Sequence, residues 1–431
     1  MIRLIHSTDR EFDKVLGTIM ARGETAETHV EATVRSIIDD VRLRGDDALV
    51  EYTEKFDRVK LFAAKLRVTS DEITAARAAL KESQIHSLQL AADRIRAFHE
   101  RQVENSWFMT EETGTIMGQV VRPVERAGIY VPGGKASYPS SVLMNAIPAR
   151  VAGVKKVVMV VPAPNGEINP ALLVAADIAG VDEIYKIGGA QAVAALAYGT
   201  STVPKVDVIV GPGNIYVATA KRMVFGTVNI DMIAGPSEIL VIADETAHPE
   251  YIAIDLLSQA EHDELASSIL VTTSEELAHK VKDELGKQLS TLSRRTIASK
   301  SLLSHGAIII VKDLAEAASV ANRIAPEHLE LSVAAPFELL PHIENAGAIF
   351  LGHYTAEAVG DYAAGPNHVL PTGGTARFSS PLSVHHFVKR SSVIAFSKQG
   401  LHAIGDDVMR IADMEGLEAH GLAVKVRMQE N

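Results

Sequence analysis

Residues 156–161 read KVVMVV, residues 183–187 read EIYKI and residues 206–210 read VDVIV, and a stretch with helical periodicity follows each of these apolar runs. The helical stretches cover residues 169–180, 190–198 and 215–225. Short apolar runs between turns are typical of buried strands, and their alternation with helices is the pattern of a parallel sheet with crossover helices. The stretch from 156 to 225 therefore predicts an α/β fold.

A second series of the same kind follows along the chain. Its predicted strands lie at 238–243, 268–273, 307–311 and 348–351, and its predicted helices at 249–264, 274–292 and 314–324. Two such series predict two parallel-sheet domains. Because ligands of open α/β sheets bind in the crevice at the carboxyl ends of the strands, we expect a nucleotide there.

The segments that flank these two series have a different pattern of apolar residues. Apolar residues at helical spacing predict helices within residues 24–60 and 71–104, and strand-like pieces broken by glycine and proline follow between 116 and 131. Two helical patterns near 401–412 and 416–428 are too short to form a core of their own. We expect this tail to pack on another surface.

The composition excludes several classes of function. The chain has 431 residues, a formal net charge of −12 and no cysteine. An acidic balance disfavours nucleic acid as a partner, and the lack of cysteine excludes disulfides, thiolate metal sites and a thiol nucleophile. Acidic residues 9, 11 and 13 interrupt the region where a signal sequence would be apolar, and no apolar run approaches the ~20 residues of a membrane span. We expect a cytoplasmic protein with no membrane partner.

Two glycine-rich turns follow predicted strands. They are GGAQ at 188–191 and GPGN at 211–214. Such turns present bare backbone N–H groups at the start of a helix, which suits a phosphate. The dinucleotide fingerprint G-x-G-x-x-G is incomplete, because Tyr216 stands at its third glycine position. The turns are therefore either phosphate-binding loops or simply tight connections.

A candidate metal pair lies near the end of the predicted helix 249–264. Gln259 and His262 are three residues apart, so their side chains share one face of a helix and could bind one ion. Glutamine is an unusual metal ligand, and such a pair is also typical of a solvated helix face. The pair alone leaves both interpretations open.

Further polar residues stand in segments rich in glycine and proline. Glu327 and His328 place a carboxylate beside an imidazole, a combination that can serve two proton transfers, although a histidine at a helix end with a capping acid fits the same pattern. Asp361 lies in a Gly- and Pro-rich stretch that is either a ligand-binding loop or a plain connection.

Taken together, these blocks resemble the histidinol dehydrogenase family over nearly the whole chain. The segments that carry the resemblance are GIYVPGG at 128–134, YPSSVLMN at 138–145, IGGAQA at 187–192, GPGN at 211–214, AGPSE at 234–238, QAEHD at 259–263, APEHL at 325–329, the loop 360–375, and EGL at 415–417 with His420. No motif position departs from the family pattern.

The resemblance implies a zinc- and NAD-dependent oxidation of L-histidinol to L-histidine through L-histidinal, the last step of histidine biosynthesis. It implies one zinc ion per subunit, with the ligands Gln259, His262, Asp361 and His420. It also implies substrate contacts from Ser237, Glu415 and His328 beside those ligands, and NAD contacts from Tyr130, Gln191 and Asn214.

In the chemistry that the resemblance implies, His328 is the base that removes the alcohol proton and acts again in the second oxidation. Glu327 activates the water that hydrates the aldehyde. The lack of cysteine agrees with hydration, since it excludes the thiohemiacetal route of many aldehyde dehydrogenases.

The resemblance also implies a homodimer of subunits with two incomplete Rossmann-like domains. We predict an N-terminal helical segment at 1–23, a discontinuous first α/β domain at 24–128 and 238–381, a second Rossmann-like domain at 129–237, and a tail domain at 382–431 that reaches the partner's site. Two alternatives stay open: a related zinc and NAD dehydrogenase of another amino or sulfonated polyol, and, in a different class, a zinc hydrolase in which Glu327 activates water without NAD.

Overall fold

The computed structural model describes residues 2–20, 27–133 and 137–429. Its contacts divide the chain into two compact units, one made of Met1–Gln102 with Val124–Phe387 and the other of Val103–Pro123 with Val388–Asn431. Among the described residues, no helix combines the length and the apolar character needed to cross a membrane.

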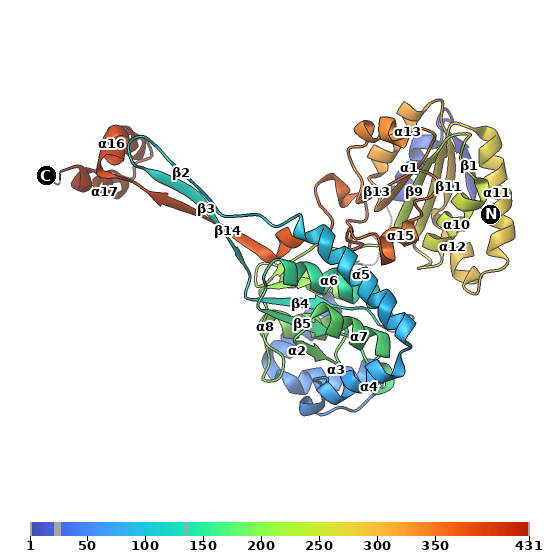
Figure 1. The fold of residues 1–431 in the computed structure, drawn as a ribbon, viewed down its shortest axis with the longest axis horizontal. Coiled ribbons are helices and arrows are strands. Elements are labelled where there is room, and N and C mark those ends of the chain that lie inside the picture. Colours follow the sequence, from blue (N-terminus) through green and yellow to red (C-terminus); the bar gives the residue numbers. More distant parts are fainter. Residues whose placement is uncertain (1, 21–26, 134–136, 430–431) are drawn as a thin grey trace. The chain divides into compact units, whose positions relative to one another are not determined.

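The first unit contains a six-stranded parallel sheet with the order β1-β11-β10-β9-β12-β13. In chain order its strands are β1 (Arg3–His6), β9 (Glu238–Ala243), β10 (Ser267–Thr272), β11 (Ala307–Ile310), β12 (His328–Ser332) and β13 (Ala348–Leu351). Helices α1 (Phe12–Met20) and α13 (Leu314–Ile324) cover one face, and α10 (Pro249–Ala260), α11 (Glu275–Leu289) and α12 (Arg295–His305) cover the other (Figure 1). Two short helices, α14 (Pro336–Leu339) and α15 (Glu357–Tyr362), follow β12 and β13.

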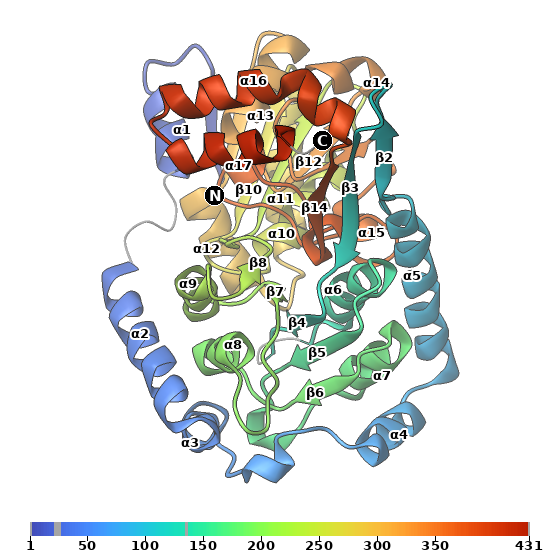
Figure 2. The same cartoon turned by 90° about the vertical axis from the view of Figure 1, so that its left-hand side faces the viewer.

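The same unit contains a five-stranded parallel sheet with the order β6-β5-β4-β7-β8. Its strands are β4 (Arg126–Tyr130), β5 (Lys156–Val160), β6 (Glu183–Tyr185), β7 (Val208–Val210) and β8 (Asn229–Ile230). One face packs against α2 (Glu27–Arg44), α3 (Asp46–Asp57), α8 (Gly189–Tyr198) and α9 (Ile215–Val224). The other packs against α4 (Ser70–Ala79), α5 (Glu82–Glu100), α6 (Pro139–Val151) and α7 (Pro170–Ala179) (Figure 2).

The second unit is an antiparallel sheet followed by a helical hairpin. Strand β3 (Ile116–Pro123) pairs with β2 (Trp107–Thr110) on one side and with β14 (Val388–Ala395) on the other. The sheet is followed by α16 (Lys398–Met414) and α17 (Glu418–Met428), which pack on each other. Large apolar side chains of this unit stay exposed, among them Phe108, Ile394 and Met414. The unit therefore buries little core of its own, as the tail pattern predicts.

The α/β prediction is confirmed, since every strand and helix predicted in the two series is present. Three details of the prediction are wrong. Residues 3–6 form β1 rather than part of a helical segment, and residues 328–332 form a strand rather than a loop or helix end. The predicted helix 71–104 is two helices, α4 and α5, because Leu80 has extended backbone angles.

The helices between residues 27 and 100 contribute to the two cores on either face of the five-stranded sheet, and Val34, Ile38 and Leu49 belong to the same buried cluster as residues of β4, β5 and α8. The first strand and helix of the chain instead join the six-stranded sheet. These contacts differ from the predicted grouping of 24–128 with 238–381. The domain boundaries themselves stay a prediction, because packing inside one compact unit does not show which parts fold alone.

A buried ion pair supports the turn that follows β7. The ammonium of Lys221 contacts the carboxylate of Asp231, and neither side chain is more than 2% exposed. Lys221 also donates to the carbonyl oxygen of Gly211 (2.9 Å), and the Gly211 N–H donates to Asp231 (2.7 Å). Both backbone hydrogen-bonding groups of Gly211 therefore end on this ion pair.

Lys221→Met would leave the Asp231 carboxylate buried without its cation. We expect the free energy of unfolding to fall by about 3–5 kcal/mol, because removing one partner of a buried ion pair leaves the other charge buried without a counter-charge. Urea unfolding measures this loss. The matched control is Arg77→Met, which breaks the exposed pair with Asp177 and should cost about 0–1 kcal/mol. Equal losses in the two variants would contradict the structural role of Lys221.

Candidate active site

His328 is the first residue of β12 and pairs with Ile239 at the beginning of β9. Its imidazole is buried, and Nδ1 lies 2.9 Å from the backbone carbonyl oxygen of Glu238. Since a carbonyl oxygen can only accept, Nδ1 donates this hydrogen bond and Nε2 is the nitrogen that can take up a proton. Within the described part of the chain, Nε2 has no hydrogen-bond partner.

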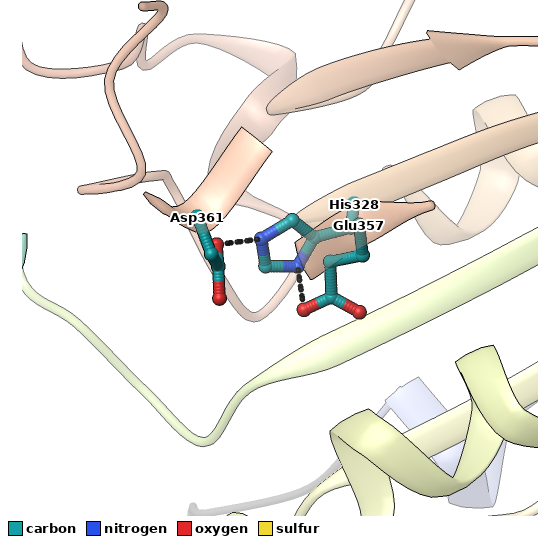
Figure 3. A group of neighbouring side chains, drawn as sticks. All are labelled: His328, Glu357 and Asp361. Carbon is teal, nitrogen blue, oxygen red and sulfur yellow. Dashed lines mark ion pairs between the residues drawn. The ribbon is translucent and has the colours of Figure 1, made fainter. Parts of the chain in front are cut away.

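Three carboxylates surround this imidazole. Glu327 Oε2 lies 3.7 Å from Nδ1, Glu357 Oε1 lies 3.6 Å from Nδ1, and Asp361 Oδ1 lies 3.7 Å from Nε2. Figure 3 shows Glu357 and Asp361 on opposite sides of the ring. The ring is therefore held between negative groups in a buried place.

Local structure positions each carboxylate. The Glu238 N–H donates to Glu327 Oε2 (2.9 Å), so the same residue of β9 anchors both Glu327 and His328. Glu357 and Asp361 are one helical turn apart on α15, and the Glu357 N–H donates to the buried Glu330 carboxylate (2.9 Å). Strand β12 thus fixes the first turn of the helix that carries both acids.

Burial and charge shift the pKa values of these groups. Burial raises the pKa of Glu327 to about 8 and that of Glu357 to about 7, although the nearby His328 charge opposes both shifts. Burial opposes the charged form of His328, but the Glu357, Glu327 and Asp361 carboxylates outweigh it and raise the pKa of His328 well above its usual value. Near neutral pH the cluster of His328 and its carboxylates therefore holds protons tightly, and the raised pKa values make each group in its deprotonated form a stronger base than usual.

The predicted metal residues are partly gathered around the same ring. Gln259, buried near the end of α10, places its side-chain amide 3.1 Å from His328 Nδ1. Desolvation lowers the pKa of His262, and the Asp361 charge opposes this shift. His328, Glu357 and Asp361 have potential ligand atoms within 4.8 Å of one another, and of these three only Asp361 belongs to the predicted zinc set.

A cavity of about 560 Å³ opens beside these groups. Its lining combines polar side chains, among them His328, Asp361 and His368, with apolar ones including Phe98 and Phe350. His368 is fixed there, since its Nδ1 lies 2.9 Å from the Asp361 carbonyl oxygen and its Nε2 lies 3.2 Å from the Ser141 hydroxyl. The cavity can accept a small molecule that has both polar and apolar parts.

The predicted NAD residues lie at the carboxyl ends of strands in the five-stranded sheet. Tyr130 ends β4, and its buried hydroxyl accepts a hydrogen bond from the Gly189 N–H (3.0 Å). Gln191 is buried in the first turn of α8, and among the described residues its Oε1 has no partner. Asn214 caps α9 by accepting from the backbone N–H groups of Tyr216 and Val217. Gly134 of the turn after β4 lies outside the described residues.

The remaining predicted residues divide between the two units. Ser237 directly precedes Glu238, and its carbonyl oxygen accepts from the Ser267 N–H (3.0 Å), so it lies at the same edge of the sheet as His328. Glu415 and His420 belong to the second unit, where both are exposed. The structure therefore gathers Gln259, Glu327, His328 and Asp361, and the roles of Glu415 and His420 stay a prediction.

Sequence reasoning missed Glu357, Glu330 and His368. Acids in an apolar, glycine-rich context resemble solvated loop residues, so nothing in the local pattern marks them as buried. The spacing of Glu357 and Asp361, four residues apart on one helix face, is the one signal that could have indicated a shared site.

Comparison with known proteins agrees with this geometry. The family model described as histidinol dehydrogenase matches residues 20–428. The histidinol dehydrogenases of Syntrophotalea carbinolica and Geobacter sulfurreducens are each 61% identical, the first over 100% of both chains and the second over 99% of this chain and 100% of the relative. The crystal structure of histidinol dehydrogenase from Elizabethkingia anophelis aligns with a TM-score of 0.94 at 40% identity, over 99% of this chain and 98% of the other.

The alignments with these relatives cover the whole chain. The buried Glu327–His328 pair, the Gln259 amide and the α15 carboxylate therefore lie in a framework shared along its whole length. The chain belongs to the histidinol dehydrogenase family.

Proposed function

We propose that this chain oxidises L-histidinol to L-histidine through L-histidinal, with NAD+ as the oxidant and zinc in the site. As a member of its family the chain is an oxidoreductase. The observation that carries the proposal is His328, a buried base whose Nε2 has no hydrogen-bond partner within the described residues, which faces the Asp361 carboxylate and lines a cavity. No observation specifically favours the polyol or hydrolase alternative.

Three of the predicted ligands carry donor atoms that fit a zinc ion. Gln259 offers an amide oxygen, His262 an imidazole nitrogen and Asp361 a carboxylate oxygen, all of which are zinc ligand types. Two buried polar atoms without hydrogen-bond partners among the described residues, Nε2 of His328 and Oε2 of Glu357, agree with a place that receives polar groups. We infer that Gln259, His262 and Asp361 bind the metal and that His420 completes the set.

When bound, zinc would orient the substrate's nitrogen atoms and NAD+ would accept a hydride in each of the two oxidations. His328 removes the hydroxyl proton of the substrate at Nε2, while its Nδ1–H bond to Glu238 keeps the ring in the required orientation. Glu327 takes a proton from water as that water adds to the aldehyde. After His328 has released the first proton to water, it removes the proton of the hydrate in the second oxidation.

Several features of the five-stranded sheet support NAD binding there. Gly211 has a φ of +108°, and a Cβ at this position would lie 2.1 Å from the Tyr130 carbonyl oxygen, so only glycine fits this turn. The turn places Asn214 at the beginning of α9, where backbone N–H groups and the helix dipole favour a phosphate. We assign Tyr130, Gln191 and Asn214 to the cofactor, with the unpartnered Gln191 Oε1 as a ligand acceptor.

We also propose that the chain works as a homodimer whose sites are shared. Glu415 and His420 are exposed in a unit that leaves Trp107, Ile394 and Met414 more than half exposed. Exposed apolar patches on a small unit are typical of an interaction surface. We infer that this unit packs on a second copy and presents Glu415 and His420 to the partner's substrate. The cytoplasmic location stays a prediction.

The function is tested by incubating zinc-loaded protein with L-histidinol and NAD+ and counting NADH against histidine. We expect two NADH for each histidine, because alcohol and aldehyde oxidation each release one hydride. Absorbance of reduced nicotinamide and chromatography of the product give the ratio. A zinc-loaded protein that forms no NADH from histidinol would contradict histidinol as the substrate and would favour the polyol or hydrolase alternative.

The division of roles predicts different losses in two histidine variants. His262→Ala should lose bound zinc, since it removes a ligand, whereas His328→Ala should retain zinc and lose turnover by about 10²–10⁴-fold, the usual contribution of a general base. Metal analysis after gel filtration and steady-state rates measure both quantities. Equal loss of zinc in the two variants would overturn this division.

Shared sites predict that two inactive variants restore activity when they are mixed. In a hybrid dimer of His328→Ala with His420→Ala, one site carries both lesions and the other carries none. Unfolding and refolding the mixture should therefore restore about a quarter of the wild-type rate, since about half of random dimers are hybrids. The control refolds each variant alone. Failure of the mixture to exceed these controls would place His420 in its own chain's site or outside any site.

A further inference from the structure

The five-stranded sheet has the strand order of a dinucleotide-binding domain. Its order β6-β5-β4-β7-β8 corresponds to 3-2-1-4-5, with β4 as the first strand and β5 as the second. In such sheets an Asp or Glu after the second strand hydrogen-bonds the ribose of the adenosine half and specifies NAD. This chain has no acid there, since β5 is followed by Val161, Pro162, Ala163 and Pro164.

A carboxylate from another element occupies this place. Asp57 is the last residue of α3, and its Oδ2 accepts a hydrogen bond from the Ala163 N–H (3.2 Å), directly after β5. The contact brings an acid from 106 residues earlier in the chain to the end of the second strand. The fold thus supplies the charge that the strand itself lacks.

The Asp57 carboxylate is accessible enough to bind a ligand. Its side chain is only partly buried, and the described residues include no ion pair to it. The contact with Ala163 places Asp57 at the carboxyl end of β5, next to the end of β4, where Tyr130 pairs with Val160. Gln191 and Asn214 follow β6 and β7 at the same edge of the sheet.

We propose that the Asp57 carboxylate hydrogen-bonds the 2′- and 3′-hydroxyls of the adenosine ribose and thereby selects NAD over NADP. The inference rests on the proposed use of NAD and adds the residue that specifies it. A carboxylate accepts hydrogen bonds from a ribose diol and repels a 2′-phosphate, so one group supplies both affinity and discrimination. Once the Asp57 charge is removed, the positive charge of the next residue, Arg58, would attract a 2′-phosphate.

The test compares Asp57→Asn with wild type, both loaded with zinc. We expect KM for NAD+ to rise about tenfold or more while kcat changes little, and kcat/KM for NADP+ relative to NAD+ to rise by at least as much, since a hydrogen bond to a charged group is lost. Fluorescence titration with NADH and NADPH gives the same comparison without turnover. Glu54→Gln, an exposed acid on the same helix, is the matched control and should behave as wild type.

The 2′-hydroxyl is tested separately with 2′-deoxy-NAD+. Wild type should bind this analogue more weakly than NAD+, and Asp57→Asn should bind the two alike. Asp57→Ser, which keeps an acceptor for the Ala163 N–H, is the second variant if Asp57→Asn does not fold, as judged by thermal unfolding. Folded variants with an unchanged NADP+/NAD+ ratio would overturn the role of Asp57. A wild type that binds neither NADH nor NADPH would overturn the proposed function itself.

Discussion

The hydrogen bond between His328 Nδ1 and the Glu238 carbonyl oxygen is the interaction on which the site depends. It joins the beginnings of two paired parallel strands, so the sheet register sets the ring orientation and leaves Nε2 beside Asp361. A base that is used twice in one turnover, the role we propose for His328, must return to the same orientation each time. A backbone acceptor in a central strand meets this requirement better than a mobile side chain, because the strand cannot move without disturbing the core.

The candidate site residues lie at the carboxyl edge of one parallel sheet and at the amino edge of the other. In the five-stranded sheet Tyr130 and the turns at Gly189 and Gly211 stand at the carboxyl ends of strands, as the rule for nucleotide sites in open α/β sheets requires. In the six-stranded sheet Glu327 and His328 stand at the amino ends of strands. The residues predicted to bind NAD therefore lie at the carboxyl edge of one sheet, whereas the proposed acid–base residues lie at the amino edge of the other.

The alternation of apolar runs and helices predicted both parallel sheets, because burial on two faces leaves a strong signal in the sequence. Sequence motifs also indicated Gln259, His328 and Asp361. The strand that begins at His328 was not predicted, since a histidine and Glu330 interrupt its apolar pattern, and both are charged groups that the fold buries. Glu357 was missed for the same reason: its burial arises from contacts with β12, which local periodicity does not contain.

These buried acids interrupt the pattern of apolar residues from which strands and helices are predicted. Burying Glu327, Glu330 and Glu357 around one imidazole costs stability, since desolvation raises the pKa of each carboxyl. The same desolvation brings the pKa of Glu327 to about 8, where a carboxyl group can both take and release a proton near neutral pH. Solvent-exposed acids would fold more readily and would remain ionised, and so would be much weaker bases toward water. The residues hardest to predict are therefore the ones whose chemistry requires the environment that the pattern disfavours.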